Sequence, residues 1–98
     1  MMRFLIRMHF PADSGNELVR DSNFPKKLEG VLNTIKPEAV YFTPFDGDRG
    51  VYMVVDIASA DMIAGISEPL WQMFRGKLEL TPVMVLEDLK KALQSPKK

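Results

Sequence analysis

Apolar residues in this chain recur with a period of two in some segments and with helical spacing in others. The order of these segments constrains the fold more than any other feature of the sequence. Residues 2–10, MRFLIRMHF, alternate as a strand with one buried face does. Residues 28–35 carry apolar side chains at i, i+3, i+4 and i+7, as an amphipathic helix does. The expected elements are a strand at 2–10, a short helical piece ending at Arg20, a helix from Pro25 to Pro37, strands at 39–45 and 51–58, a helix at 60–76, a strand at 78–85 and a short helix at 87–94.

The main elements follow the order strand, helix, strand, strand, helix, strand. This order is the split βαβ pattern of a ferredoxin-like α+β fold. Right-handed crossovers then place four antiparallel strands in the spatial order 4-1-3-2, with both helices on one face. A chain of 98 residues is expected to form a single domain over 1–98, in which 85–98 are a short C-terminal helix and tail.

The alternation gives the expected sheet two faces of different character. The helix-covered face takes the most apolar side of each strand and forms the core. The opposite face holds both charged and apolar side chains, namely Arg3, Leu5, Arg7, His9, Tyr41, Thr43, Tyr52, Val54, Asp56, Glu79, Thr81 and Val83. At about 400 Å², this face is large for an exposed patch of such composition. We therefore expect a homodimer in which a second copy covers it, since a two-fold pair of like sheets is self-complementary.

Composition excludes several functional classes. Thirteen basic and thirteen acidic residues cancel, which argues against nucleic acid as a partner. The chain has no cysteine and one histidine, so neither thiol chemistry nor a His-rich or Cys-type metal site is expected. The segment DGDRG lacks most ligands of a calcium loop and is typical of a hairpin turn. We predict no metal and no cofactor.

No apolar run approaches the roughly 20 residues of a membrane-spanning helix. The first apolar run could be mistaken for a secretory signal, but Arg7 and His9 interrupt it. A cytoplasmic protein with no membrane partner is therefore expected.

Four stretches together resemble the small dimeric α+β barrel proteins. They are the strand MRFLIR with the Pro…GN turn after it, the hairpin KPEAVYFTPFDG, the segment SEPLW and the ending VMVLEDL. The match covers nearly the whole chain and is similar in particular to a largely uncharacterised bacterial group of that superfamily. The superfamily also contains muconolactone isomerases and cofactor-free monooxygenases. The resemblance implies a small molecule bound in a cavity formed by the sheet and the helices.

The haem-degrading members of that superfamily carry a set of Asn, Trp and His residues. Only Trp71, on the second main helix, is placed as the resemblance requires. Asn16 follows the first strand and His9 lies on it, so the pattern departs from the haem-degrading one.

His9, Glu79 and Tyr52 are candidate catalytic residues. In the expected register His9 approaches Tyr52 on one side and Glu79 on the other, while Arg3 approaches Asp56. A carboxylate beside the imidazole would fix its tautomer, as proton abstraction next to a carbonyl requires. The alternative is a hydrogen-bonded polar cluster in a dimer interface, which is the more common arrangement.

Arg7, Asn16, Tyr41 and Trp71 are candidate ligand-binding residues. Arg7 has no obvious acidic partner in the sequence and could bind a substrate carboxylate, or it could form an inter-subunit salt bridge. Asn16 could contact a ligand oxygen, although helix capping is the more common role. Trp71 could line an apolar pocket with Tyr41 and Tyr52, or it could belong to the core.

Three functions follow from these candidates. The first is a binding protein for a small aromatic or carboxylate compound. The second is a cofactor-independent isomerase or monooxygenase in which His9 moves a proton. The third is a purely structural oligomerisation module. The sequence does not decide whether the chain is an enzyme.

Overall fold

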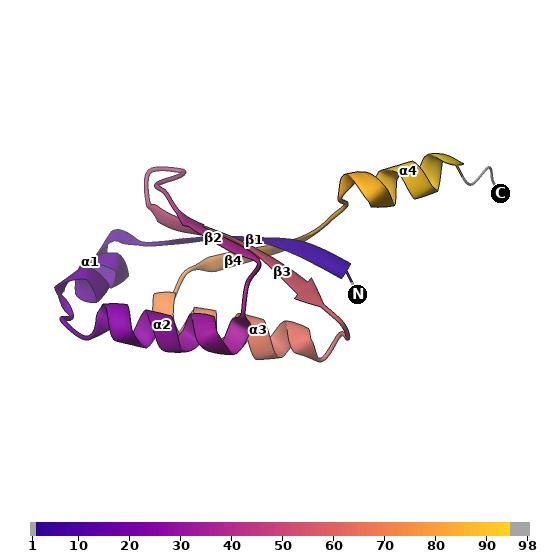
Figure 1. Ribbon diagram of the computed structural model, residues 1–98. Helices are drawn as coiled ribbons and strands as arrows, with labels where there is room; N and C mark the ends of the chain where they lie inside the picture. Colours follow the sequence, from indigo (N-terminus) through magenta and orange to yellow (C-terminus); the bar gives the residue numbers. More distant parts are fainter. Residues whose placement is uncertain (1, 95–98) are drawn as a thin grey trace.

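A single four-stranded antiparallel sheet organises the protein. The computed structural model describes residues 2–94, and its strands lie in the order β2-β3-β1-β4. This order confirms the predicted ferredoxin-like α+β class and the 4-1-3-2 arrangement (Figure 1). The elements are β1 (Met2–Phe10), α1 (Ala12–Arg20), α2 (Phe24–Ile35), β2 (Ala39–Phe42), β3 (Arg49–Ile57), α3 (Met62–Phe74), β4 (Lys77–Val83) and α4 (Leu86–Gln94).

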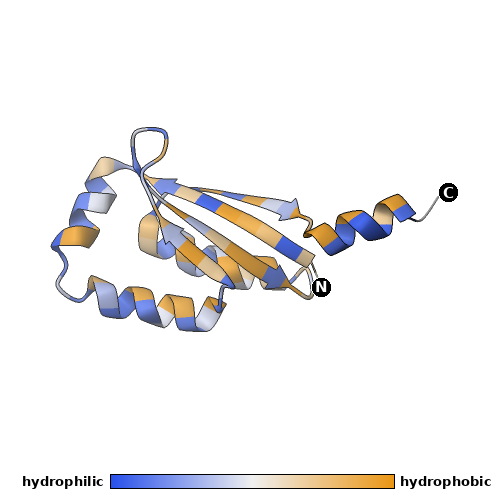
Figure 2. Cartoon of the chain, turned by 45° about the horizontal axis from the view of Figure 1, so that its top comes forward, coloured by the Kyte–Doolittle hydropathy of each residue, from blue (hydrophilic) through white to orange (hydrophobic). Residues whose placement is uncertain are grey.

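Helices α2 and α3 cover one face of this sheet and α1 lies at its end, whereas α4 stands apart beyond β4 (Figure 1). The core lies between the sheet and α3. It is built from every second residue of the two central strands together with one stripe of α3, as the period of two requires. Its buried members are Ile6, Met8, Phe10, Val51, Met53, Val55, Ile57, Ile66, Leu70 and Phe74. Colouring by hydropathy shows the alternation along the strands (Figure 2).

The DGDRG segment forms the tight hairpin turn that the sequence predicts. Phe45 and Asp48 exchange two backbone hydrogen bonds, of 3.0 and 3.1 Å. The two residues between them, Asp46 and Gly47, have φ of 52° and 79°. Positive φ at both central positions is the mark of a type I′ turn, which Asp-Gly favours. Strand β2 ends at Phe42, earlier than the sequence analysis expected.

Helix α1 begins earlier than the turn-rich sequence indicated. It starts at Ala12, directly after Pro11, so that Ser14 and Asn16 lie inside it. Asn16 is therefore not at the helix start, and its expected position there was wrong. The Ser14 hydroxyl is buried and donates to the carbonyl oxygens of Pro11 (3.1 Å) and Phe74 (3.2 Å). This second bond ties α1 to the end of α3.

Gly76 and Gly30 give a matched pair for testing the packing of this fold. A Cβ on Gly76 would lie 2.1 Å from the His9 carbonyl oxygen and 2.8 Å from Phe10 Cα, whereas nothing lies within 4 Å of one on Gly30. We expect Gly76→Ala to destabilise the protein by about 1–3 kcal/mol, because backbone must move. Gly30→Ala, inside α2, should stabilise it by up to about 1 kcal/mol. Urea unfolding measures both, and equal effects of the two substitutions would contradict the packing described.

Candidate functional site

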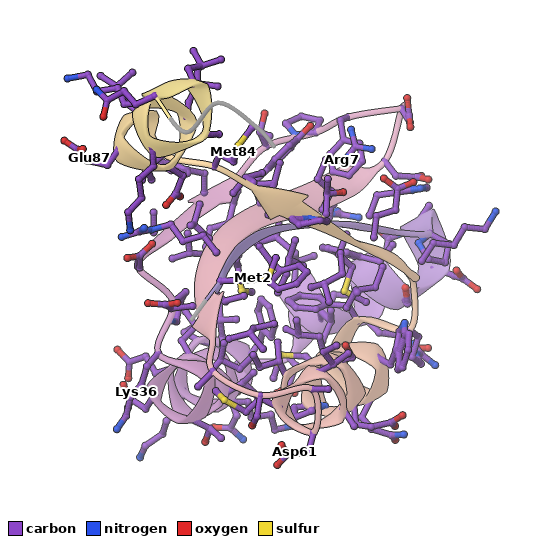
Figure 3. The ribbon with its side chains drawn as sticks, turned by 90° about the vertical axis from the view of Figure 1, so that its right-hand side faces the viewer. Met2, Arg7, Lys36, Asp61, Met84 and Glu87 are labelled. Atoms are coloured by element: carbon purple, nitrogen blue, oxygen red, sulfur yellow. The ribbon has the colours of Figure 1, made fainter. Side chains whose placement is uncertain are left out.

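Arg7 lies on the open face of the sheet, which is the face on the side away from α2 and α3 (Figure 3). The register places Tyr52 of β3 and Glu79 of β4 directly opposite it. Its guanidinium donates a hydrogen bond to the Glu79 carboxylate, and this bond raises the pKa of Arg7 above its ordinary value. Arg7 thus has the acidic partner that the sequence analysis did not find. That partner belongs to the same chain.

Arg3 is held in a similar way at the other end of β1. It lies opposite Asp56 in the register, as predicted. Its side chain, however, forms a two-bond ion pair with Glu38, at 2.8 and 3.1 Å. The hydrogen bond with Glu38 is the main reason that the pKa of Arg3 is raised. The cations of β1 are therefore paired within the chain.

His9 is shifted by two residues, along the strand register, from the neighbours expected for it. Its register partners are Gly50 and Lys77, not Tyr52 and Glu79. Its Nδ1 is 3.4 Å from Oδ2 of Asp48, and its ring meets Phe45 edge-on with the centroids 5.2 Å apart. The expected pairing was wrong because a shift of two residues leaves every side chain on its own face, so alternation cannot detect it. The carboxylate that could orient His9 is Asp48.

The remaining candidates do not converge. Tyr41 lies opposite Tyr52 on the edge strand β2 and is 67% exposed. Trp71 is on α3, 41% exposed, and Asn16 is on α1. Tyr41 and Tyr52 share the open face with Arg7 and Glu79, whereas Asn16 and Trp71 belong to the helical layer.

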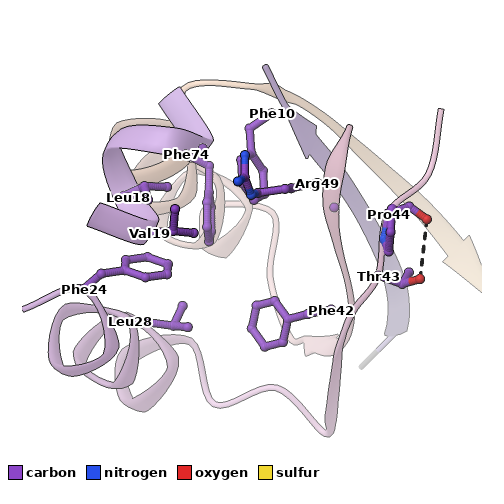
Figure 4. A pocket seen from close by; sticks show the side chains of 12 residues that line it. Phe10, Leu18, Val19, Phe24, Leu28, Phe42, Thr43, Pro44, Arg49 and Phe74 are labelled. Atoms are coloured by element: carbon purple, nitrogen blue, oxygen red, sulfur yellow. Dashed lines mark hydrogen bonds between the residues drawn. The ribbon is translucent and has the colours of Figure 1, made fainter. Parts of the chain in front are cut away.

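The best-formed cavity in the described residues lies on the helix side of the sheet, where none of these candidates line it. Its volume is about 400 Å³, and it sits between α1, α2 and the β2–β3 hairpin (Figure 4). Aromatic and aliphatic side chains form most of its wall. The lining residues are Phe10, Gly15, Leu18, Val19, Phe24, Leu28, Phe42, Thr43, Pro44, Arg49, Gly50 and Phe74.

Among the described residues, Arg49 is the only charged one in this wall. Its side chain reaches from β3 toward α1 with the guanidinium beside Phe10, while Phe24, Leu28 and Phe42 lie at the other end (Figure 4). Within residues 2–94 no carboxylate lies at ion-pairing distance from it. Gly15 makes room for it, because a Cβ there would be 2.7 Å from Nη1 of Arg49. The cavity therefore combines an apolar wall with one cation that has no acidic partner there.

Sequence reasoning missed this cavity for an identifiable reason. By alternation Phe10 and Phe42 fall on the apolar side of their strands, which is expected to form the core, and Arg49 belongs to DGDRG, which is expected to form a turn. Each assignment holds locally, but the helical layer does not fill the space at this end of the sheet. The one sequence signal was Gly15 in α1, since glycine is unfavourable inside a helix unless packing requires it.

Other kinds of site find less support in the described part of the chain. Between residues 2 and 94, no three His, Asp or Glu side chains come together as a metal site would require. No helix in that range is long and apolar enough to cross a membrane. Compared with known proteins, the chain matches no family model and no curated protein sequence.

An ion pair joins the ends of α1 and α2, which form two walls of the cavity, and pH can test its contribution. The hydrogen bond from Lys27 Nζ to Asp21 Oδ2, 2.8 Å, lowers the pKa of Asp21 below 3.8. A carboxyl group whose pKa is lower in the folded state stabilises the protein at pH values above its unfolded-state pKa. This contribution is lost as the pH falls through the folded-state pKa. Asp21→Asn should therefore lower the free energy of unfolding at neutral pH and lose its effect in strong acid.

Urea unfolding of both proteins from neutral pH to below 3.8 measures this difference. Asn keeps an acceptor for the Asn23 backbone N–H, which donates to Asp21 Oδ1 at 2.9 Å. The comparison therefore isolates the charge. A difference between the proteins that did not change with pH would contradict the ion pair.

Proposed function

We propose that the protein binds a small aromatic carboxylate in the cavity between α1, α2 and the β2–β3 hairpin. The observation that supports this proposal is that one cation among the described residues, Arg49, lies at one end of an otherwise apolar space. The volume of about 400 Å³ lies within the range of small-molecule sites. The function is the binding role predicted from the sequence, but at a different place and with a different arginine.

The apolar wall supplies affinity for a ring. Phe24 and Phe74 are already in edge-to-face contact, with centroids 6.4 Å apart, and Phe10 stacks on Phe74 at 4.7 Å. Aromatic ligands bind well among aromatic side chains that present both edges and faces. Phe42 is exposed at the cavity, and covering it would remove apolar surface from water.

Arg49 supplies the preference for an anion. A guanidinium binds a carboxylate through two parallel hydrogen bonds, and such charge-assisted bonds are stronger than neutral ones. Arg7 is a weaker candidate for this role, because Glu79 already occupies its guanidinium. The cavity also argues against a purely structural module, which needs no such space.

The proposal includes the homodimer expected from the sequence, with the open faces of two sheets in contact as in the dimeric α+β barrel proteins. The cavity lies on the opposite side of each sheet. A second copy on the open face would therefore not occupy the cavity.

A cofactor-independent isomerase or monooxygenase remains the second candidate function, favoured by the His9–Asp48 contact. The carboxylate of Asp48 could hold the imidazole tautomer as Glu79 was expected to do. His9 is on the open face, so its substrate would bind there and not in the cavity. His9→Gln should abolish turnover under this function and leave cavity binding unchanged.

Calorimetric titration with 2-naphthoate and with neutral 2-naphthol tests the binding proposal. We expect the anion to bind more tightly than the alcohol. Arg49→Met, which keeps the apolar stem, should weaken 2-naphthoate by about 10- to 100-fold and leave 2-naphthol nearly unchanged. Gly15→Ala should act in the same direction, because it displaces the guanidinium.

Arg7→Met is the matched control on the opposite face of the sheet. It should leave the affinity for both compounds unchanged. Binding that depends on Arg7 and not on Arg49 would place the ligand on the open face. Failure of both compounds to bind would overturn the proposal.

A further inference from the structure

We propose that α4 is an arm that packs against a second copy of this chain. Two like protomers would exchange these arms at the rim of their paired sheets. This inference rests on the proposed sheet-to-sheet dimer and assigns a role to the segment that the monomer fold leaves without a partner.

Helix α4 is amphipathic and has no buried residue. Its leucines, Leu86, Leu89 and Leu93, are spaced as one helical face, and the first and last are 66% and 75% exposed. Met84, in the connector before it, is 66% exposed. Exposed apolar residues are ordinary when scattered, but a continuous stripe on a helix with no core contact indicates a missing partner.

The position of α4 indicates where that partner lies. Figures 1 and 3 show α4 displaced to the side of the sheet opposite α2 and α3, which is the side of Arg7 and the open face. Its start is fixed locally, because the Asp88 carboxylate accepts a hydrogen bond from the Val85 backbone N–H at 3.1 Å. The helix therefore projects past the end of its own sheet, on the side that a second sheet would occupy.

The area of the open face also requires an additional contact. Four strands give a footprint of about 400 Å². A stable complex commonly buries about 800 Å² on each partner, so sheet pairing alone falls short. The nine residues of α4 span about 13 Å. Each arm adds area to both protomers, because it covers the partner and is itself covered, and two arms bring the contact close to the usual size.

The charges of the open face are compatible with a like partner. The cations Arg3 and Arg7 are paired with Glu38 and Glu79 within the chain. The whole chain has no net charge. Two copies can therefore approach without burying Arg3 or Arg7 unpaired, the cost of which would oppose association. Asp56 and Lys77 on the same face form no ion pair among residues 2–94, and their charges are opposite. A strongly acidic or basic partner would find no complementary excess on this face.

Sedimentation equilibrium of the full chain tests the proposal through the variant Leu86→Ser/Leu89→Ser/Leu93→Ser. The wild type should be a dimer, and the variant should dissociate at least about tenfold more readily. The matched control is Glu87→Ser/Lys91→Ser/Gln94→Ser, which alters the polar side of α4 without changing the net charge. It should associate as the wild type does. Urea unfolding of dilute samples should show that the leucine variant keeps its monomer fold.

Mixed dimers of isotope-labelled and unlabelled chains provide a direct readout. Isotope-filtered NMR should show contacts from the α4 leucine methyl groups to the other chain. If the wild type is a dimer and the leucine variant dimerises equally well, the proposed role of the arm is overturned and the sheet pairing is retained. A monomeric wild type would overturn both. Neither result bears on ligand binding in the cavity, which the titrations with 2-naphthoate test separately.

Discussion

The pairing of β1 with both β3 and β4 is the constraint on which the rest of the structure depends. The strand is central in the sheet, so each of its side chains has neighbours on two sides. Because successive side chains point to opposite faces, Ile6 and Met8 must enter the core when Arg3 and Arg7 point away from it. Each arginine then meets a carboxylate of the same chain, Glu38 or Glu79. The two arginines of the open face are therefore paired within the chain.

The helix side of the sheet follows a different rule, because a layer of helices cannot cover every residue of the strands. Helix α3 packs on β1 and β3 through Leu70 and Phe74. At the Phe10 end of β1, α1 and the hairpin border a space that side chains do not fill. Arg49 enters this space because Gly15 has no side chain to exclude it. Under our proposals the two sides of one sheet have separate roles, ligand binding on one and association on the other.

Alternation assigned most residues to the correct face of the sheet, but it did not show which of them lie close together. Thr43 is an exception, because it follows the end of β2 and lines the cavity on the helix side. Arg3 lies opposite Asp56 as expected, whereas Tyr52 and Glu79 lie opposite Arg7 and not His9. Alternation assigns a residue to a face, and a shift of two residues preserves that assignment. The register is a property of the whole sheet. The candidates on the open face could therefore be predicted as a set of residues, but not as pairs of residues in contact, and the cavity with Arg49 was not predicted.

The sequence by itself determined the elements, their order, the topology of the sheet and the turn at Asp46–Gly47. These features depend on local periodicity and backbone preferences, which a single chain displays directly. Only the tertiary structure decided that His9 meets Asp48, that Arg49 lines an apolar cavity and that α4 buries no residue within the described part of the chain. Each of these facts depends on distances between segments far apart in the sequence. Such distances are fixed by packing, which the periodicity of a sequence does not report.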